Sequence, residues 1–555
     1  MSLPQDLNMD ELPCQPYSSP RLLKWFYCTH RVSSSLFLLP YWAIKYAFYK
    51  RPRASWSLAE TLLIDFTRRV SAITDMAGVQ HATRDPTAEP DHSSLKETRF
   101  EWVPGVAGEM CSGVVDDENV RPLKRVGTFI WERADDVRLD YQNGNWKDAE
   151  VDNESIDEEA SVGYNDDVGS GDLVGVYFHG GGYTHFSAHE NAQTSAIPRR
   201  LMLYNYFASI HAVEYRLLPD SAFPAALQDG LSVYAHLIRS GVPAHKIVII
   251  GDSAGGNIAL ALARWIRDEK KLPAPAGLLL LSPWCDPSHS FPHSTTHFVP
   301  RPNPEDYLAD EPTARRLLVT SLLGEKPHSY LSSPYISPAS QLGPHGSFDH
   351  FPPCFVHYGD AERLQEEIES LIRGLKRDGV PLDFLKTPDA VHDVLMVRFW
   401  NEDVRREIYD RIADWCDKLV RTSSAKDREL GLPTYVSRSR AGSRASIMKG
   451  NNGTGGLTPP QASGSGSGGR SRAPSGGADL IRMNSSFEGA PSSKATGGES
   501  APRGAGSPVA SPQPTSSPLS QVLPNGNIKV GEGHQPTTTI SEVIEEDEIQ
   551  EAPRS

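Results

Sequence analysis

The stretch IVIIGDSAGG, residues 247–256, decides how this sequence folds. Its four leading apolar residues predict a buried strand, and the amphipathic run 256–268 predicts a helix directly after it. The turn between them has the form G-x-S-x-G, in which side chains at positions 251 and 255 would collide with neighbouring backbone. Such a turn raises the Oγ atom of Ser253 above the sheet at a helix N-terminus, so we expect Ser253 to be a nucleophile.

Around this stretch, strand-like apolar runs alternate with helix-like segments from about residue 98 to residue 420. The alternation predicts an α/β fold, with a mostly parallel sheet covered by helices on both faces. In such sheets the functional residues gather at the carboxyl ends of the strands. The predicted strands are 126–131, 173–178, 207–215, 247–250, 277–281, 353–358 and 382–385, and the predicted helices are 223–240, 256–268, 361–378 and 402–420.

Three successive glycines follow the predicted strand 173–178, in the sequence His179-Gly180-Gly181-Gly182. Without side chains, the backbone N–H groups there can turn inward and hold an oxyanion that develops on an ester carbonyl. The N–H of Ala254, directly after the nucleophile, is a further donor. We therefore expect an oxyanion hole made by Gly180, Gly181, Gly182 and Ala254.

A base and an acid are expected further along the chain, because chains with this strand–turn–helix motif carry the nucleophile first, then the acid and then the base. His392 follows the last predicted strand and precedes the last helix, which suits a base that reaches back to the nucleophile. Two carboxylates follow the strand 353–358 and could orient the imidazole. We favour Glu362 from its spacing, with Asp360 as the alternative acid.

Together these motifs resemble the hormone-sensitive-lipase-like branch of the α/β-hydrolases, over roughly residues 100–420. The resemblance extends to YRLLPD at 215–220, FPAA at 223–226 and SPW at 282–284. It implies an α/β-hydrolase fold with a helical cap, built from the N-terminal region and the segment 288–351. The chain departs from the family's usual pattern in having Glu362 in place of Asp, and Asp393 after the base.

The N-terminal motifs RPR at 51–53 and WSL at 56–58 are similar to those of fungal members, some of which resemble sterol-ester deacetylases. The expected reaction is hydrolysis of a lipophilic small-molecule ester by acyl transfer through Ser253, His392 and Glu362, without a metal or an organic cofactor. One alternative is an amidase of the formamidase type, which uses the same machinery. The other is a non-catalytic receptor or scaffold, against which the presence of both Ser253 and His392 argues.

The sequence divides into an N-terminal helical or cap region (1–97), a catalytic domain (98–420) and a tail (421–555). The tail is rich in Ser, Gly and Pro, which predicts disorder. It is either a solvated tail or a docking segment for an unidentified protein partner. Within the catalytic domain, the strongly acidic segment 135–172 is expected to be an exposed insertion between two strands.

The composition excludes some classes of protein. The net charge of 55 − 70 = −15 argues against a nucleic-acid-binding protein, which needs cations for the phosphates. The six cysteines are scattered and form no C-x-x-C pair, which argues against a zinc ribbon and a disulfide scaffold.

The N-terminal region carries an apolar run at 36–48 that contains Pro40 and Lys45. It has three interpretations: a buried cap helix, an amphipathic element on a membrane surface formed by residues 21–53, or a membrane-spanning helix. The first twenty residues lack the pattern of a secretory signal. We therefore expect a cytoplasmic protein that is not secreted, with an endomembrane or lipid-droplet surface as a place of attachment.

Overall fold

The computed structural model describes residues 21–79, 85–132, 173–291, 299–343 and 346–430. The predicted acidic insertion at 135–172 lies entirely outside the described residues. The predicted disordered tail also lies outside them from residue 431 onward.

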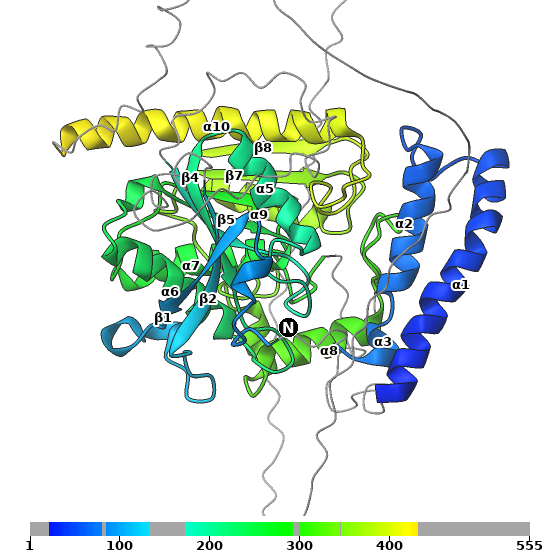
Figure 1. The fold of residues 1–555 in the computed structure, drawn as a ribbon, viewed down its shortest axis with the longest axis horizontal. Helices are drawn as coiled ribbons and strands as arrows, with labels where there is room; N and C mark the ends of the chain where they lie inside the picture. The colour runs from blue at the N-terminus through cyan, green and yellow to red at the C-terminus, as the bar shows by residue number, and fades with distance from the viewer. Residues whose placement is uncertain (1–20, 80–84, 133–172, 292–298, 344–345, 431–555) are drawn as a thin grey trace, which may run out of the picture. The chain divides into compact units, whose positions relative to one another are not determined.

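The centre of the fold is an eight-stranded sheet in the order β1-β2-β4-β3-β5-β6-β7-β8 (Figure 1). Strand β2 pairs antiparallel with β1 and β4, and every other neighbouring pair is parallel. The predicted mostly parallel α/β sheet is therefore confirmed. The strands are β1 (Thr98–Pro104), β2 (Arg125–Glu132), β3 (Leu173–Phe178), β4 (Phe207–Glu214), β5 (Ile247–Asp252), β6 (Gly277–Leu281), β7 (Cys354–Gly359) and β8 (Leu382–Thr387).

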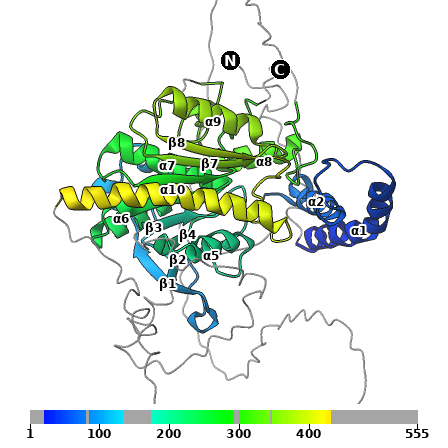
Figure 2. The ribbon, with the colours of Figure 1, turned by 90° about the horizontal axis from the view of Figure 1, so that it is seen from above.

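Helices cover both faces of this sheet, because alternate residues of the buried strands point to opposite sides. Along β5, Ile247 and Ile249 enter one apolar core, while Val248 and Ile250 enter the other. Helices α6, α7 and α9 supply the first core, and α5 and α10 supply the second; α10 crosses in front of the strands in Figure 2. The helices are α5 (Ala196–Leu203), α6 (Ala225–Arg239), α7 (Ala254–Glu269), α8 (Pro312–Leu323), α9 (Gln365–Arg377) and α10 (Glu402–Glu429).

Helix α5 was not predicted from the sequence, and two further elements, β1 and α10, differ from the prediction. Strand β1 was not predicted, because its alternating charged residues and terminal Pro104 are typical of an edge strand and not of a buried one. Helix α10 continues to Glu429, so the first nine residues assigned to the tail are helical. Its last turns are held by Asp427, which pairs with Lys246 at 2.8 Å and His245 at 2.7 Å, an ionic contact that apolar periodicity does not reveal.

The N-terminal helices pack against one another (Figure 1). Arg31 of α1 donates to two carbonyl groups at the end of α2, and Tyr46 donates to Asp65 at 2.6 Å. The apolar run 36–48 is part of α1, but Phe37 is 84% exposed, so the interpretation as a buried cap helix is wrong: only one face of α1 touches α2. Within the described ranges, no helix is both long and apolar enough to cross a membrane. The helices are α1 (Arg21–Phe48), α2 (Leu58–Ser71) and α3 (Thr74–Ala77).

Candidate active site

The turn from β5 to α7 is built around Ser253, which has a φ of 51°. This left-handed conformation is strained for a residue with a side chain, and it turns Oγ away from the helix. The flanking glycines are required sterically: a Cβ atom on Gly255 would overlap the carbonyl oxygen of Phe178, and one on Gly251 would overlap that of Gly255. The turn therefore has the geometry that the motif predicts.

His392 lies in the loop after β8 and reaches the same edge of the sheet. Its Nε2 atom lies 2.9 Å from Oγ of Ser253, which is a hydrogen-bond distance. Burial, and to a lesser degree the charge of Arg301, lowers the pKa of His392 to about 3. The imidazole is therefore neutral at neutral pH, so one ring nitrogen has a free lone pair for the proton of Ser253.

Glu362, which follows β7, is fully buried beside this imidazole. Its Oε2 atom lies 3.9 Å from Nδ1 of His392 and accepts hydrogen bonds from the hydroxyl of Ser282 at 2.6 Å and the N–H of Gly359 at 3.3 Å. Burial raises the pKa of Glu362 well above its ordinary value. The carboxyl group thus faces the ring at a distance somewhat longer than a hydrogen bond, as is common before substrate binds.

Asp360, the alternative acid, points elsewhere. Its Oδ1 atom accepts the N–H of Asp389 at 2.6 Å and lies 3.8 Å from the guanidinium of Arg53. About a third of its side chain is exposed. The structure brings Glu362, and not Asp360, to the imidazole of His392.

The glycine loop after β3 offers fewer oxyanion donors than predicted. The N–H of Gly180 donates to Oδ2 of Asp252 at 2.8 Å, so it is already used and its assignment to the oxyanion hole is wrong. In the part of the chain that the structure describes, no hydrogen bond uses the N–H groups of Gly181, Gly182 or Ala254. These three remain able to bind an oxyanion.

A pair of buried carboxyl groups, Asp252 and Asp393, lies beside the nucleophile and base. Asp252 accepts the hydroxyl of Tyr177 at 2.6 Å and shares a hydrogen bond with Asp393. Burial raises the pKa of Asp252 to about 6, and burial together with the charge of Asp252 raises that of Asp393 well above its ordinary value. The Oδ2 atom of Asp393 lies 3.7 Å from Nε2 of His392, and both raised pKa values reflect the cost of placing two buried negative charges side by side.

The motifs at 215–220 and 282–284 make buried contacts that hold the loops around Ser253 and His392 in place. The hydroxyl of Tyr215 donates to the carbonyl of His179 at 2.7 Å, and Arg216 forms a buried ion pair with Asp229 at 2.9 Å. Ser282 contacts both carboxylate-bearing loops: it donates to Glu362 and accepts the N–H of Asp393 at 3.1 Å. This contact was not predicted from the sequence, although the position of Ser282 directly after β6 places it at the same edge of the sheet as Ser253.

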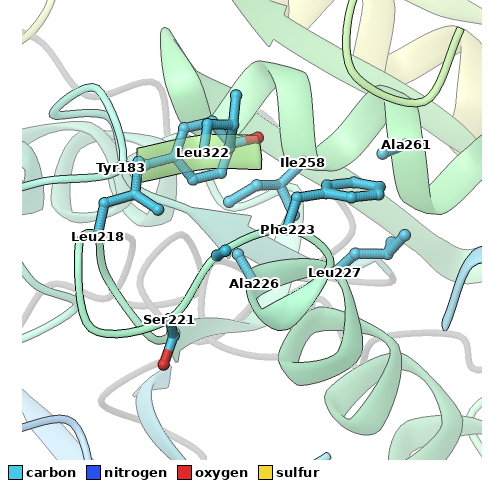
Figure 3. Close-up of a pocket in the computed structure, with 10 residues that line it drawn as sticks. Tyr183, Leu218, Ser221, Phe223, Ala226, Leu227, Ile258, Ala261 and Leu322 are labelled. Carbon is cyan, nitrogen blue, oxygen red and sulfur yellow. The ribbon is translucent and has the colours of Figure 1, made fainter. Parts of the chain in front are cut away.

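A small apolar cavity lies beside the glycine loop (Figure 3). Figure 3 shows Tyr183, Phe223 and Ile258 facing it, and Leu322 of α8 also lines it. The hydroxyl of Tyr183 donates to Asn257 at 2.7 Å, which fixes the end of the glycine loop against α7. Segment 299–343 thus reaches this side of the molecule through α8.

Residues 175–396 match a family model described as the alpha/beta hydrolase fold. The acetyl-hydrolase of Streptomyces hygroscopicus is 29% identical over 217 residues, which are 39% of this chain and 66% of that protein. The ethyl acetate hydrolase of Pseudomonas putida is 24% identical over 40% of this chain and 65% of its own length. The versiconal hemiacetal acetate esterase of Aspergillus parasiticus is 33% identical over 20% of this chain and 33% of its own.

The chain spans slightly less than two thirds of the first two of these relatives and one third of the other. The matched segment begins within β3 and ends just after His392, so it contains the glycine loop, the nucleophile turn and both later loops. Its order of strands and loops is the one in which that family carries a nucleophile, an acid and a base. Residues 175–396 of this chain therefore have the α/β-hydrolase fold, and the motifs within them resemble those of the hormone-sensitive-lipase-like branch.

Proposed function

We propose that this chain is a serine carboxylic-ester hydrolase. The observation that carries the proposal is the 2.9 Å contact between Nε2 of His392 and Oγ of Ser253. Ser253 attacks the ester carbonyl while His392 takes its proton and then passes it to the leaving alcohol. Water next attacks the acyl-enzyme and gives its proton to His392. His392 then returns this proton to Oγ of Ser253 as the carboxylic acid product leaves. Glu362 stabilises the imidazolium that forms in each half of the reaction.

The tetrahedral oxyanion would be bound by N–H groups of Gly181, Gly182 and Ala254. Each such donor in an enzyme is worth roughly 10²–10³ in rate, and a positioned general base roughly 10²–10⁴. These three N–H groups have no hydrogen-bond partner among the described residues, which supports a role for them in the reaction.

We infer that the substrate is a small-molecule ester with a short acyl group, foremost an acetyl group, on a lipophilic alcohol. The three relatives support the acyl group, because each is named for the hydrolysis of an acetyl or acetate compound. The apolar surface of α1, described below, supports the lipophilic alcohol. The close approach of Ser253 and His392 argues against the receptor alternative, and no observation favours the amidase over the esterase.

Substituting the nucleophile tests the reaction. Ser253→Ala should lower kcat for p-nitrophenyl acetate by about 10⁴-fold or more, because no other hydroxyl lies in this turn. It should also abolish labelling by a fluorophosphonate, which reacts only with an activated serine. Ser240→Ala, at the exposed end of α6, is the matched control and should behave as wild type. Hydrolysis that survives in Ser253→Ala would refute the proposal.

A second pair of variants separates the two carboxylates. Glu362→Gln keeps an acceptor for Ser282 but cannot stabilise an imidazolium, so kcat should fall about 10²–10⁴-fold. Asp360→Asn keeps an acceptor for the N–H of Asp389 and should change kcat less than about threefold. Steady-state kinetics with p-nitrophenyl acetate measures both. The opposite order of effects would make Asp360 the acid.

We also propose that α1 binds a phospholipid surface. Its side away from α2 is apolar and exposed, and the basic residues Lys24 and Lys45 lie near the two ends of the helix. An apolar helical face with flanking lysines inserts into the headgroup region of anionic bilayers. A continuous run of exposed apolar side chains along one helix is unusual unless it binds a partner or a membrane. The exposed apolar residues of α1 are Leu22, Leu23, Trp25, Phe26, Val32, Leu36, Phe37, Tyr41, Ile44 and Phe48.

Flotation with phosphatidylcholine–phosphatidylserine vesicles tests this surface. The wild-type chain should float, and the double variant Phe37→Asp, Ile44→Asp should remain in the dense fraction, because both side chains are more than half exposed on this face. Leu430→Asp, a change of an equally exposed apolar residue at the end of α10, should float. Equal flotation of the double variant and the wild type, or no flotation of either, would rule out docking through α1.

A further inference from the structure

Residues 301–310, which we call the strap, lie against both loops that carry the acid and the base. The side chain of Asp306 in the strap is fully buried. Its Oδ2 atom accepts the N–H of Arg363 at 2.9 Å, and its Oδ1 atom accepts the N–H groups of His392 at 3.3 Å and Tyr307 at 2.7 Å. One carboxylate therefore binds the backbone of the residue after Glu362 and the backbone of His392 itself.

The strap makes two further contacts with the same loops. Asn303 donates from Nδ2 to the carbonyl oxygen of Glu362 at 2.8 Å. The ring of Tyr307 lies against that of His392, with 6.0 Å between their centroids. The strap thus touches the backbone of both residues and the ring of the base.

The imidazole of His392 has little else to orient it. Among the described residues its Nδ1 atom has no hydrogen-bond partner, and the nearest oxygen of Glu362 is 3.9 Å away. The direction of the ring therefore depends on where the backbone of His392 is held. The two loops are joined by the N–H of Ala361, which donates to the carbonyl oxygen of Ala390 at 3.0 Å, and through Ser282. Asp306 adds a carboxylate that accepts the backbone N–H of His392 itself and that of Arg363.

The strap is itself fixed from the N-terminal region. Arg68 of α2 donates to the carbonyl oxygens of Glu305 and Asp306, the latter at 2.6 Å. Arg53 donates to the carboxylate of Glu305 at 2.7 Å and to Asn303 at 2.9 Å. Arg68 and Arg53 thus hold the strap from the side that faces away from His392.

We propose that Asp306 is a positioning residue for the base: its carboxylate sets the separation of the two loops and so aligns His392 with Ser253. The inference rests on the proposed ester hydrolysis and adds to it a residue outside the nucleophile, acid and base. Burial raises the pKa of Asp306 to about 6, so the carboxylate is ionised at pH 8 and can accept all three N–H groups. Loss of this carboxylate should therefore slow the proton transfer and leave the binding of substrate nearly unchanged.

Asp310 provides a matched control on the same strap. Its side chain is 2% exposed and pairs with Arg315 at 2.6 Å and Arg301 at 3.6 Å. The hydrogen bonds described for it bind neither the backbone of His392 nor that of Glu362 or Arg363. Asp310 also pairs with the guanidinium of Arg363 at 3.6 Å. Asp310→Asn thus removes an equally buried charge but none of the hydrogen bonds from Asp306 to the backbone N–H groups of Arg363 and His392.

The experiment compares full-length wild type, Asp306→Asn and Asp310→Asn with p-nitrophenyl acetate at pH 8, together with their thermal midpoints. Asp306→Asn should lower kcat about 10- to 100-fold with KM within about threefold, because a displacement of about 1 Å in a catalytic group has an effect of this size. Its rate of inactivation by a fluorophosphonate should fall by a similar factor. Asp310→Asn should lower the thermal midpoint and keep the wild-type kcat.

A wild-type kcat in Asp306→Asn, or equal losses of kcat in the two variants, overturns the proposal. If Asp306→Asn does not fold, Arg68→Ala replaces it, since Arg68 is on the surface side of the strap; it should lower kcat at least about threefold with KM retained, and an unchanged kcat overturns the proposal. Ser253→Ala distinguishes a failure of the proposed reaction from a failure of the role proposed for Asp306. If that variant stays active, the proposed reaction fails; if it is inactive while Asp306→Asn has full kcat, only the role of Asp306 fails.

Discussion

The close approach of α7 to the carboxyl end of β3 is the constraint on which the site depends. At Gly255 the helix comes so near the carbonyl of Phe178 that a side chain would not fit. This contact puts the first turn of α7 beside the glycine loop, and it forces Ser253 into a left-handed conformation. The free energy that stabilises the strained turn must come from the packing around it, which the buried strand β5 and the buried part of α7 up to Ile266 supply.

Around this turn the protein keeps several carboxyl groups out of water, which ordinarily costs free energy. The structure reduces the cost in two ways. Asp306 and Glu362 accept backbone N–H groups, while Asp252 and Asp393 share a hydrogen bond. Because these hydrogen bonds connect different loops, the same contacts that make burial tolerable also fix the loops relative to one another.

Much of the fold and part of the site could be predicted from the sequence, for identifiable reasons. The buried strands are short continuous apolar runs, and Ser253 and His392 follow two of them, so chain order and strand ends sufficed to find both. Glu362 and Asp360 are two residues apart, and only their contacts in the folded chain distinguish them: the N–H of Asp389 and the guanidinium of Arg53 lie at the carboxylate of Asp360. Gly180 was assigned wrongly because nothing in a glycine run indicates that Asp252 already uses one of its N–H groups. Asp306 carries no periodic or motif signal, so its contact with His392 could only be seen in three dimensions.

A crystal structure of the chain inactivated by diethyl fluorophosphate would show whether the three loops converge on one oxyanion site. We expect a phosphoryl group on Oγ of Ser253, with its oxygen about 3 Å from the N–H of Ala254 and from that of Gly181 or Gly182. The N–H of Gly180 should still bind Asp252. A phosphoryl group on another residue, or an oxygen directed away from all three N–H groups, would contradict the account.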